Sequence, residues 1–238
     1  AEAALRSGAG LVSVATRAAH VAGLNARCPE VMAVGVTSGQ ELEPLLDRPT
    51  VLVIGPGLGR TPWSEQLLQK ALASGKPMVL DADALNLLSA GRIGQTIDYT
   101  RSVITPHPGE AARLLGCTAG DIQDDRFAAV KKLAEKLSTT VLLKGAGTLV
   151  ADGRGDIALC PYGNPGMAVG GMGDVLSGVI GALLAQGLEP LAAAEIGACL
   201  HSLAGDCAAE ELGEIGLAAT DLLPHIRRLL NETRVRNR

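Results

Sequence analysis

A glycine-rich stretch that ends in an aspartate is the segment of this chain best suited to chemistry. From Asn164 to Asp174 it reads Asn-Pro-Gly-Met-Ala-Val-Gly-Gly-Met-Gly-Asp. Gly170, Gly171 and Gly173 lack a Cβ, so the backbone can turn sharply there and approach a ligand closely. Apolar residues then recur at helical spacing, which predicts a helix that begins at about Gly173 or Asp174. The unpaired N–H groups and the positive end of the dipole at such a helix start suit a phosphate group.

Asp174 is unexpected beside a phosphate, because its negative charge would repel the anion. A carboxylate makes chemical sense there if it accepts a proton from a hydroxyl group that attacks the phosphorus. The alternative is that Asp174 only caps the helix, as aspartate often does. The segment alone leaves both interpretations open.

Further glycine and polar residues follow predicted strands. Gly55 and Gly57, in Ile54-Gly-Pro-Gly-Leu-Gly, would let backbone amides approach a substrate, although a tight turn needs the same residue type. Asp81, Asp83 and Asn86 follow the next strand and would hydrogen-bond a substrate or fix a neighbouring loop. Asp83 is also a suitable helix N-cap, and Asn86 a suitable surface residue.

Two more motifs combine charged side chains with a constrained or flexible backbone. In Thr105-Pro-His-Pro-Gly-Glu, two prolines stiffen the backbone around His107, and Glu110 is either functional or a favourable first-turn helix charge. His107 is otherwise a surface loop histidine. In Lys144-Gly-Ala-Gly-Thr148, the lysine and the threonine hydroxyl suit a nucleotide phosphate or ribose, unless the segment is only a hairpin turn. It is not a Walker A loop, because the lysine precedes the glycines.

Short β-branched runs alternate with helical patterns, which predicts an α/β fold with a mostly parallel sheet. Ligands of such sheets bind beyond the carboxyl ends of the strands. The motifs above should therefore lie together along that one edge of the sheet, which we call the rim. Strands are predicted at Leu11–Thr16, Val31–Val36, Val51–Ile54, Met78–Asp81, Ser102–Thr105, Val141–Lys144, Thr148–Ala151 and Ile157–Leu159. Helices are predicted at Pro62–Ser74, Ala84–Ala90, Pro108–Gly116, Asp124–Leu137, Asp174–Gln186, Pro190–Leu212 and Ala219–Leu230, and residues 1–7 are predicted to be the end of a helix that stops at Gly8.

The last three predicted helices are consecutive, so the C-terminal third should form a helical layer. No proline- or serine-rich linker divides the chain, and we expect a single domain over residues 1–238. Hydrophobic residues make up 47% of the chain and aromatic residues 2%, beside 30 glycines, so the core should be closely packed Ala, Val, Leu and Ile.

Composition also excludes several classes of protein. The formal net charge of −4 and the scarcity of aromatic rings argue against nucleic-acid binding. No apolar window is long enough to span a membrane. The odd number of cysteines and the absence of a Cys-x-x-Cys pair argue against disulfides and a zinc site, and we expect a cytoplasmic protein. The cysteines are Cys28, Cys117, Cys160, Cys199 and Cys207.

Together these motifs resemble the ribokinase-like superfamily and, within it, the ADP/ATP-dependent NAD(P)H-hydrate dehydratases. The resemblance covers nearly the whole chain and includes Gly8-Ala-Gly-Leu-Val and Leu143-Lys-Gly-Ala-Gly-Thr in addition to the segments above. It implies a three-layer α/β fold and a metabolite-repair reaction, in which the S-form of NAD(P)H hydrate is dehydrated while a nucleotide, most simply ADP, releases phosphate. It further implies an upstream epimerase domain, a first strand and glycine-rich loop ahead of this chain, and a homo-oligomer.

The resemblance also assigns roles to single residues. Asp174 would be the general base and contact the substrate with Gly55, Gly57, Asn86 and His107. The nucleotide, ADP or ATP, would lie on Lys144, Gly145, Ala146, Gly147, Thr148 and Gly173, with its terminal phosphate in an anion hole of Gly170, Gly171 and Gly173. Glu110 would act on Mg²⁺ through water.

Two other functions remain as alternatives. One is a ribokinase-like kinase for a small alcohol, such as a thiazole or pyrimidine precursor; His107 in place of the asparagine of related kinases, and Met167-Ala168, count against it. The other is a nucleotide-binding subunit without catalysis, against which the intact Asp174 counts.

Overall fold

The computed structural model describes residues 1–91, 93 and 98–235. The strands are β1 (Ser13–Thr16), β2 (Met32–Gly35), β3 (Leu52–Ile54), β4 (Met78–Leu80), β5 (Ser102–Ile104), β6 (Thr140–Leu143), β7 (Thr148–Ala151) and β8 (Ile157–Cys160). The α-helices are α1 (Glu2–Arg6), α2 (Ala18–Arg27), α3 (Gly39–Leu42), α4 (Pro62–Ala73), α5 (Ala82–Ser89), α6 (Pro108–Leu115), α7 (Ala119–Asp124), α8 (Arg126–Leu137), α9 (Met172–Ala185), α10 (Pro190–Leu212) and α11 (Leu222–Val235). Short 3-10 turns span Glu43–Leu46, Pro165–Met167 and Ala219–Asp221.

The main sheet has its strands in chain order, β3-β4-β5-β6-β7-β8. β3 to β6 are parallel, and β7 and β8 run antiparallel to their neighbours. The predicted mostly parallel sheet is therefore confirmed. Residues 144–147 form the turn of the β-hairpin made by β6 and β7. β1 and β2 form a separate parallel pair instead of joining this sheet.

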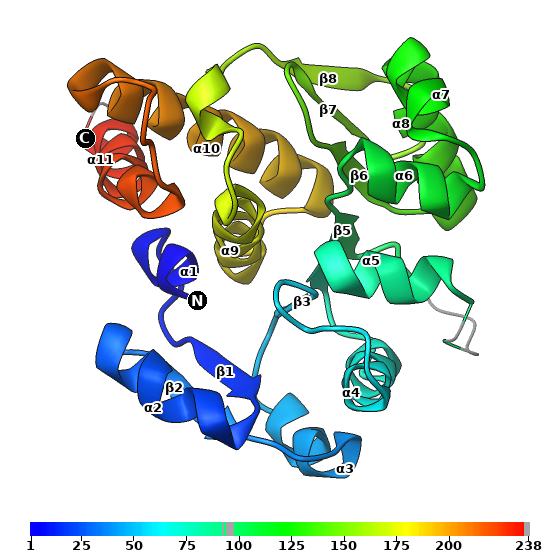
Figure 1. Ribbon diagram of the computed structural model, residues 1–238, viewed down its shortest axis with the longest axis vertical. Helices are drawn as coiled ribbons and strands as arrows, with labels where there is room; N and C mark the ends of the chain where they lie inside the picture. Colours follow the sequence, from blue (N-terminus) through cyan, green and yellow to red (C-terminus); the bar gives the residue numbers. More distant parts are fainter. Residues whose placement is uncertain (92, 94–97, 236–238) are drawn as a thin grey trace.

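Helices cover both faces of the main sheet (Figure 1). Successive strand residues point to opposite faces, so Val79 and Val103 join the core cluster on the side of α9 and α10, whereas Leu80 and Ile104 join the cluster on the side of α4 to α8. All four side chains are at most 1% exposed. Because both faces of the sheet are buried, the sequence of each of these strands is a run of mainly apolar residues.

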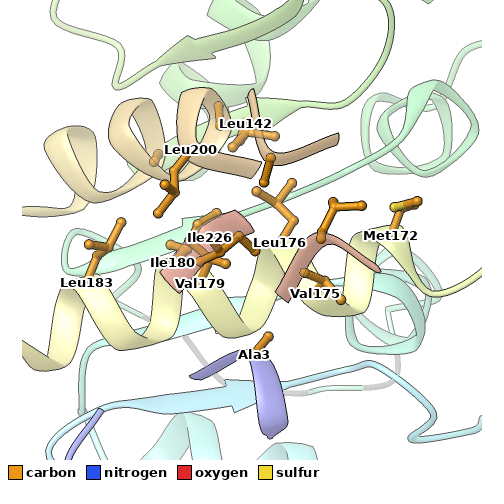
Figure 2. Close-up of a cluster of buried hydrophobic side chains, with 14 of the residues drawn as sticks. Ala3, Leu142, Met172, Val175, Leu176, Val179, Ile180, Leu183, Leu200 and Ile226 are labelled. Carbon is orange, nitrogen blue, oxygen red and sulfur yellow. The ribbon is translucent and has the colours of Figure 1, made fainter. Parts of the chain in front are cut away.

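α9 is the centre of the C-terminal helical layer, as Figure 2 shows. Leu176, Val179, Ile180 and Leu183 recur at helical spacing and pack toward α10, α11 and the sheet. Glycines bring the helices close: a Cβ on Gly197 of α10 would lie 2.7 Å from Cγ1 of Ile180. The predicted helical layer and the predicted aliphatic core are both confirmed.

The β1–β2 pair is joined to the rest of the molecule partly through Trp63 of α4. The indole Nε1 donates a hydrogen bond to the carbonyl oxygen of Val36 at 3.0 Å, just after β2. The guanidinium of Arg17 lies 4.4 Å from the ring centroid. A hydrogen bond and a cation–π contact thus meet on one side chain.

Three helices were not predicted, namely α2, α3 and α7. α2 buries no residue, so it lacks the strong apolar stripe by which helices are recognised. α7 is short and separates from α8 at Asp125, where the predicted helix Asp124–Leu137 had been continuous. In the described part of the chain, no helix is long and apolar enough to cross a membrane.

Candidate functional site

The carboxyl ends of the parallel strands and the start of α9 meet at one edge of the main sheet. Asp81 follows β4, Lys144 follows β6, and Glu110 lies in the first turn of α6, just after β5. A Cβ on Gly173 would lie 3.3 Å both from Oδ2 of Asp81 and from Nζ of Lys144. The absence of a side chain at Gly173 therefore lets the start of α9 approach this charged group.

The turn into α9 places Asp174 inside the helix. Gly171 adopts φ +89° as the N-cap, and α9 begins at Met172, slightly earlier than predicted. Asp174 is the third helical residue, so the interpretation of this residue as the N-cap is wrong. Its carboxylate is exposed and accepts no hydrogen bond from any described residue. A carboxylate at this position can accept a proton from a bound ligand.

The surroundings of Asp174 tune its basicity. Partial burial by the surrounding protein raises the pKa of its carboxyl, and the negative charge of Asp81 raises this pKa further. The positive charge of Lys144 lowers it, but the net shift is upward. A raised pKa makes the ionised carboxylate a stronger base.

Lys144 is held by two buried carboxylates. Its Nζ lies 2.6 Å from Oδ1 of Asp81 and 3.8 Å from Oε2 of Glu110. Asp81 is 1% exposed, and its Oδ2 accepts a hydrogen bond from Ser177 Oγ at 3.0 Å. Ala82, the next residue, has φ +46°, which is unusual for a residue with a Cβ. The lysine is thus fixed, with 21% of its side chain exposed toward the rim.

His107 and Glu110 form a capping box at the start of α6. Oε2 of Glu110 accepts from the His107 N–H at 2.8 Å, and Nδ1 of His107 accepts from the Gly109 N–H at 3.0 Å. His107 Nε2 lies 3.3 Å from Oε1 of Glu110, and half of the histidine side chain is exposed. Both residues belong to the rim, since Glu110 also approaches Lys144.

The glycines after β3 differ in their surroundings. A Cβ on Gly55 would lie 1.8 Å from the carbonyl oxygen of Asp81, so backbone packing alone requires glycine there. Gly57 is exposed, has φ +63°, and faces open space. Asp83 fixes this loop by accepting from the Gly59 N–H at 2.9 Å and from Nε of Arg60 at 3.1 Å.

The side-chain amide of Asn86 is already engaged within the protein. Its Nδ2 donates to the carbonyl oxygen of Ala82 at 3.0 Å, and its Oδ1 accepts from Nη1 of Arg113 at 3.0 Å. It therefore links α5 to α6.

The β6–β7 turn also lies at this edge. Gly145 and Gly147 have φ of +149° and +66°, and Thr148 Oγ1 donates to the carbonyl oxygen of Gly145 at 3.1 Å. At the α9 turn, Gly170 has open space where a side chain would begin. The glycines of both turns leave backbone amides accessible.

The carboxylates of the rim are not arranged as a set of metal ligands. Among the described residues, no group of three or more His, Cys, Asp or Glu side chains could hold a metal ion. Asp81 and Glu110 are occupied by Lys144, Ser177 and His107. Mg²⁺ commonly uses few protein ligands besides water and substrate phosphates, so an ion bound mainly by a nucleotide fits these residues.

Sequence reasoning missed the contacts by which three residues support the rim. Asp81 was predicted, with Asp83 and Asn86, to hydrogen-bond a substrate or to fix a neighbouring loop, but its contacts with Lys144 and Ser177 were not predicted. Ser177 lies one helical turn after Asp174 and faces Asp81. His201 of α10 is 7% exposed and lies near the backbone of Met172; burial lowers its pKa to about 4. Nothing in a helical stretch of α10 indicated that contact.

Comparisons with known proteins agree with this geometry. A family model described as NAD(P)H-hydrate dehydratase matches residues 1–228. A bifunctional NAD(P)H-hydrate repair enzyme from Coxiella burnetii is 53% identical over 97% of this chain, which spans only 46% of that relative's length. An ADP-dependent (S)-NAD(P)H-hydrate dehydratase from Neisseria meningitidis is 45% identical over 75% of this chain and 62% of its own.

A solved structure shares the fold over nearly the whole chain. It is an ADP/ATP-dependent NAD(P)H-hydrate dehydratase from Bacillus subtilis, co-crystallised with ATP and Mg²⁺ and soaked with CoA. The TM-score is 0.80 at 28% identity, with 97% of this chain and 84% of that chain covered. The predicted ribokinase-like fold is confirmed, since another similar structure, from Enterococcus faecalis, is described as a ribokinase-like superfamily protein (TM-score 0.85, 33% identity, 97% of this chain and 80% of that one).

Proposed function

Since the chain belongs to the NAD(P)H-hydrate dehydratase family, we propose that it dehydrates the S-form of hydrated NADH or NADPH with consumption of a nucleotide. ADP is the nucleotide we favour, because the Neisseria relative is named as ADP-dependent. The reaction would convert ADP to AMP and phosphate and return the hydrated cofactor to NAD(P)H.

The observation that carries this proposal is the unpaired Asp174 carboxylate, with its raised pKa, beside a lysine fixed by two buried carboxylates. In the proposed mechanism, the terminal phosphate lies against the amides of Gly170, Gly171 and Gly173. Asp174 takes the proton from the ring hydroxyl that hydration added, and the hydroxyl oxygen attacks the terminal phosphorus while AMP leaves with the electron pair of the broken P–O bond. Phosphate then leaves the ring with that oxygen as the C–O bond breaks, the neighbouring ring carbon loses a proton to water, and the ring double bond re-forms. The acceptance of the proton by Asp174 and the fixed geometry are this chain's contribution.

The remaining contacts follow from the same arrangement. Lys144 to Thr148 would hold the nucleotide, and Gly55, Gly57 and His107 would contact the hydrated nicotinamide. Asn86 would act through the α5–α6 link described above. Mg²⁺ would be bound chiefly by the nucleotide phosphates, with Glu110 acting through water, and would offset the phosphate charge.

We further propose that the chain is one dehydratase domain that works beside an epimerase domain, because the similar bifunctional repair enzymes are about twice its length. The five free cysteines support a reducing, cytoplasmic setting. A homo-oligomeric state stays a prediction.

The proposal is tested by incubating the protein with the S-hydrate of NADH and following NADH absorbance. We expect absorbance to recover only when ADP or ATP is present. A stable phosphorylated product without NADH would instead identify a kinase, and nucleotide binding without any turnover would identify a non-catalytic subunit.

A further inference from the structure

Arg126, the first residue of α8, reaches across to the β6–β7 turn. Its Nη1 donates to the carbonyl oxygen of Ala146, and its Nη2 donates to that of Leu143 at 3.3 Å. Its Nε is buried and has no hydrogen-bond partner among the described residues. Two donors of one rigid guanidinium fork therefore fix two carbonyl groups of the same turn.

This contact and a φ of +149° both favour glycine at position 145 without any ligand. A Cβ on Gly145 would lie 2.9 Å from Nη2 of Arg126, closer than a carbon atom and a guanidinium nitrogen can approach. The guanidinium therefore packs directly against the Gly145 backbone.

The hydrogen bonds of the turn are distributed unevenly. The carbonyl oxygens of Leu143, Gly145 and Ala146 all accept from side chains, those of Arg126 and Thr148. In the described part of the chain, the N–H groups of Gly145, Ala146 and Gly147 donate to no protein group. With these three carbonyl oxygens occupied and three N–H groups unpaired, the turn can bind an acceptor-rich ligand group, such as a phosphate.

We propose that Arg126 is a positioning residue for the nucleotide: it holds the turn at residues 144–148 with its amide N–H groups free for the ligand. The inference rests on the proposed function, which assigns this turn to the nucleotide. A turn that is fixed before binding loses less conformational freedom on binding, so the affinity for nucleotide is higher. Arg126 would not touch the reacting atoms.

The test compares two substitutions. Arg126→Met keeps the aliphatic stem and removes all donors, whereas Arg126→Lys keeps the charge but offers one ammonium in place of the fork. We expect Arg126→Met to raise the Kd for ADP and the KM for nucleotide at least about tenfold. Arg126→Lys should recover only part of this loss, and the KM for the hydrated cofactor and kcat at saturating nucleotide should change less than about threefold.

Arg154→Met is the matched control, because Arg154 lies in the next hairpin with 81% of its side chain exposed. It should leave the nucleotide Kd unchanged. A folded Arg126→Met protein that binds ADP as tightly as wild type overturns the inference. So does full recovery by Arg126→Lys, which would show that charge alone matters, or failure of both variants to fold, which would show that Arg126 stabilises the whole domain.

Gly147→Val separates this inference from the proposed function. If Gly147→Val weakens ADP binding and Arg126→Met does not, the turn binds nucleotide and only the role of Arg126 is wrong. If neither affects binding of ADP, the assignment of the turn itself is wrong.

Discussion

At the scale of single residues, Asp174 combines exposure with a raised pKa, a state that costs stability when the carboxylate is ionised. A carboxyl pKa raised in the folded protein means that ionising this carboxyl is less favourable in the folded state than in the unfolded state, so the ionised form lowers stability. Asp174 is not the helix N-cap, so it has no capping role that would offset this cost. Such a residue is explained by its chemistry better than by its contribution to folding.

We predict that Asp174→Asn lowers turnover roughly 10²–10⁴-fold, because the amide cannot accept the proton. The melting temperature should stay the same or rise slightly, since the unfavourable charge is gone. Nucleotide affinity should hold or increase, because a negative charge near the phosphate is removed. A melting curve, an ADP titration and a rate on this one variant test all three. A variant that dehydrates at nearly the wild-type rate would contradict the mechanism.

Asp81 should control the pH at which the enzyme loses activity. The base must be ionised, so the rate should fall as pH decreases through the pKa of Asp174, which is raised from its ordinary value. Asp81→Asn removes a charge that raises this pKa and leaves Lys144 less neutralised, and both effects lower the pKa. We therefore expect the acidic limb of the kcat/KM profile to move to lower pH. Asp83→Asn, the control, should leave the limb where it is.

At the scale of elements, the β6–β7 turn and the start of α9 both depend on glycines with positive φ, Gly145 and Gly147 within the turn and Gly171 as the N-cap of the helix. We predict that Gly147→Val, at φ +66°, weakens nucleotide binding by blocking the approach of the ligand to the backbone. Gly155→Val introduces the same kind of strain in the next hairpin, at φ +136°, where no atom is near. If both variants bind ADP with wild-type affinity, the first turn is an ordinary hairpin.

The contact between α10 and α9 should be sensitive to acid. His201 binds fewer protons in the folded state than in the unfolded state, because burial lowers its pKa from 6.5 to about 4. Stability from this group is complete above the unfolded pKa and is lost as pH falls between these two values, by about 3 kcal/mol in total. Urea unfolding at several pH values should show this loss in wild type and in the exposed-site control His20→Gln. His201→Met should remove it.

At the scale of the whole molecule, the scarcity of aromatic side chains is matched by close approach of helices at glycines. We predict that Gly197→Ala destabilises the protein by about 1–3 kcal/mol, because the methyl group would overlap buried Ile180. Gly23→Ala, in α2 with no atom within 4 Å, should stabilise by up to about 1 kcal/mol. Thermal unfolding of the two variants measures both effects, and equal shifts would contradict the packing argument.

The sequence was informative wherever a local rule determined the structure. The buried strands, α9 and α10 were predicted because long apolar runs have few alternatives, and motifs after strands pointed to one rim. The contacts of Asp81 and Arg126 were not predicted because their partners lie far away in the chain, at Lys144 and Ala146. Helix α2 was missed because a helix that buries no residue leaves no apolar stripe to detect.

The one tryptophan of the chain lies at the junction between the β1–β2 pair and the main body. Its fluorescence should therefore report on that junction alone, since its indole is bonded to the segment after β2 and covered by Arg17. Circular dichroism, in contrast, averages over all helices. If the emission changes at a lower urea concentration than the helical signal, the β1–β2 pair separates before the sheet and its helices unfold, and two-state unfolding does not apply. The fluorescence of the wild-type protein thus reports the order in which the β1–β2 pair and the main sheet unfold.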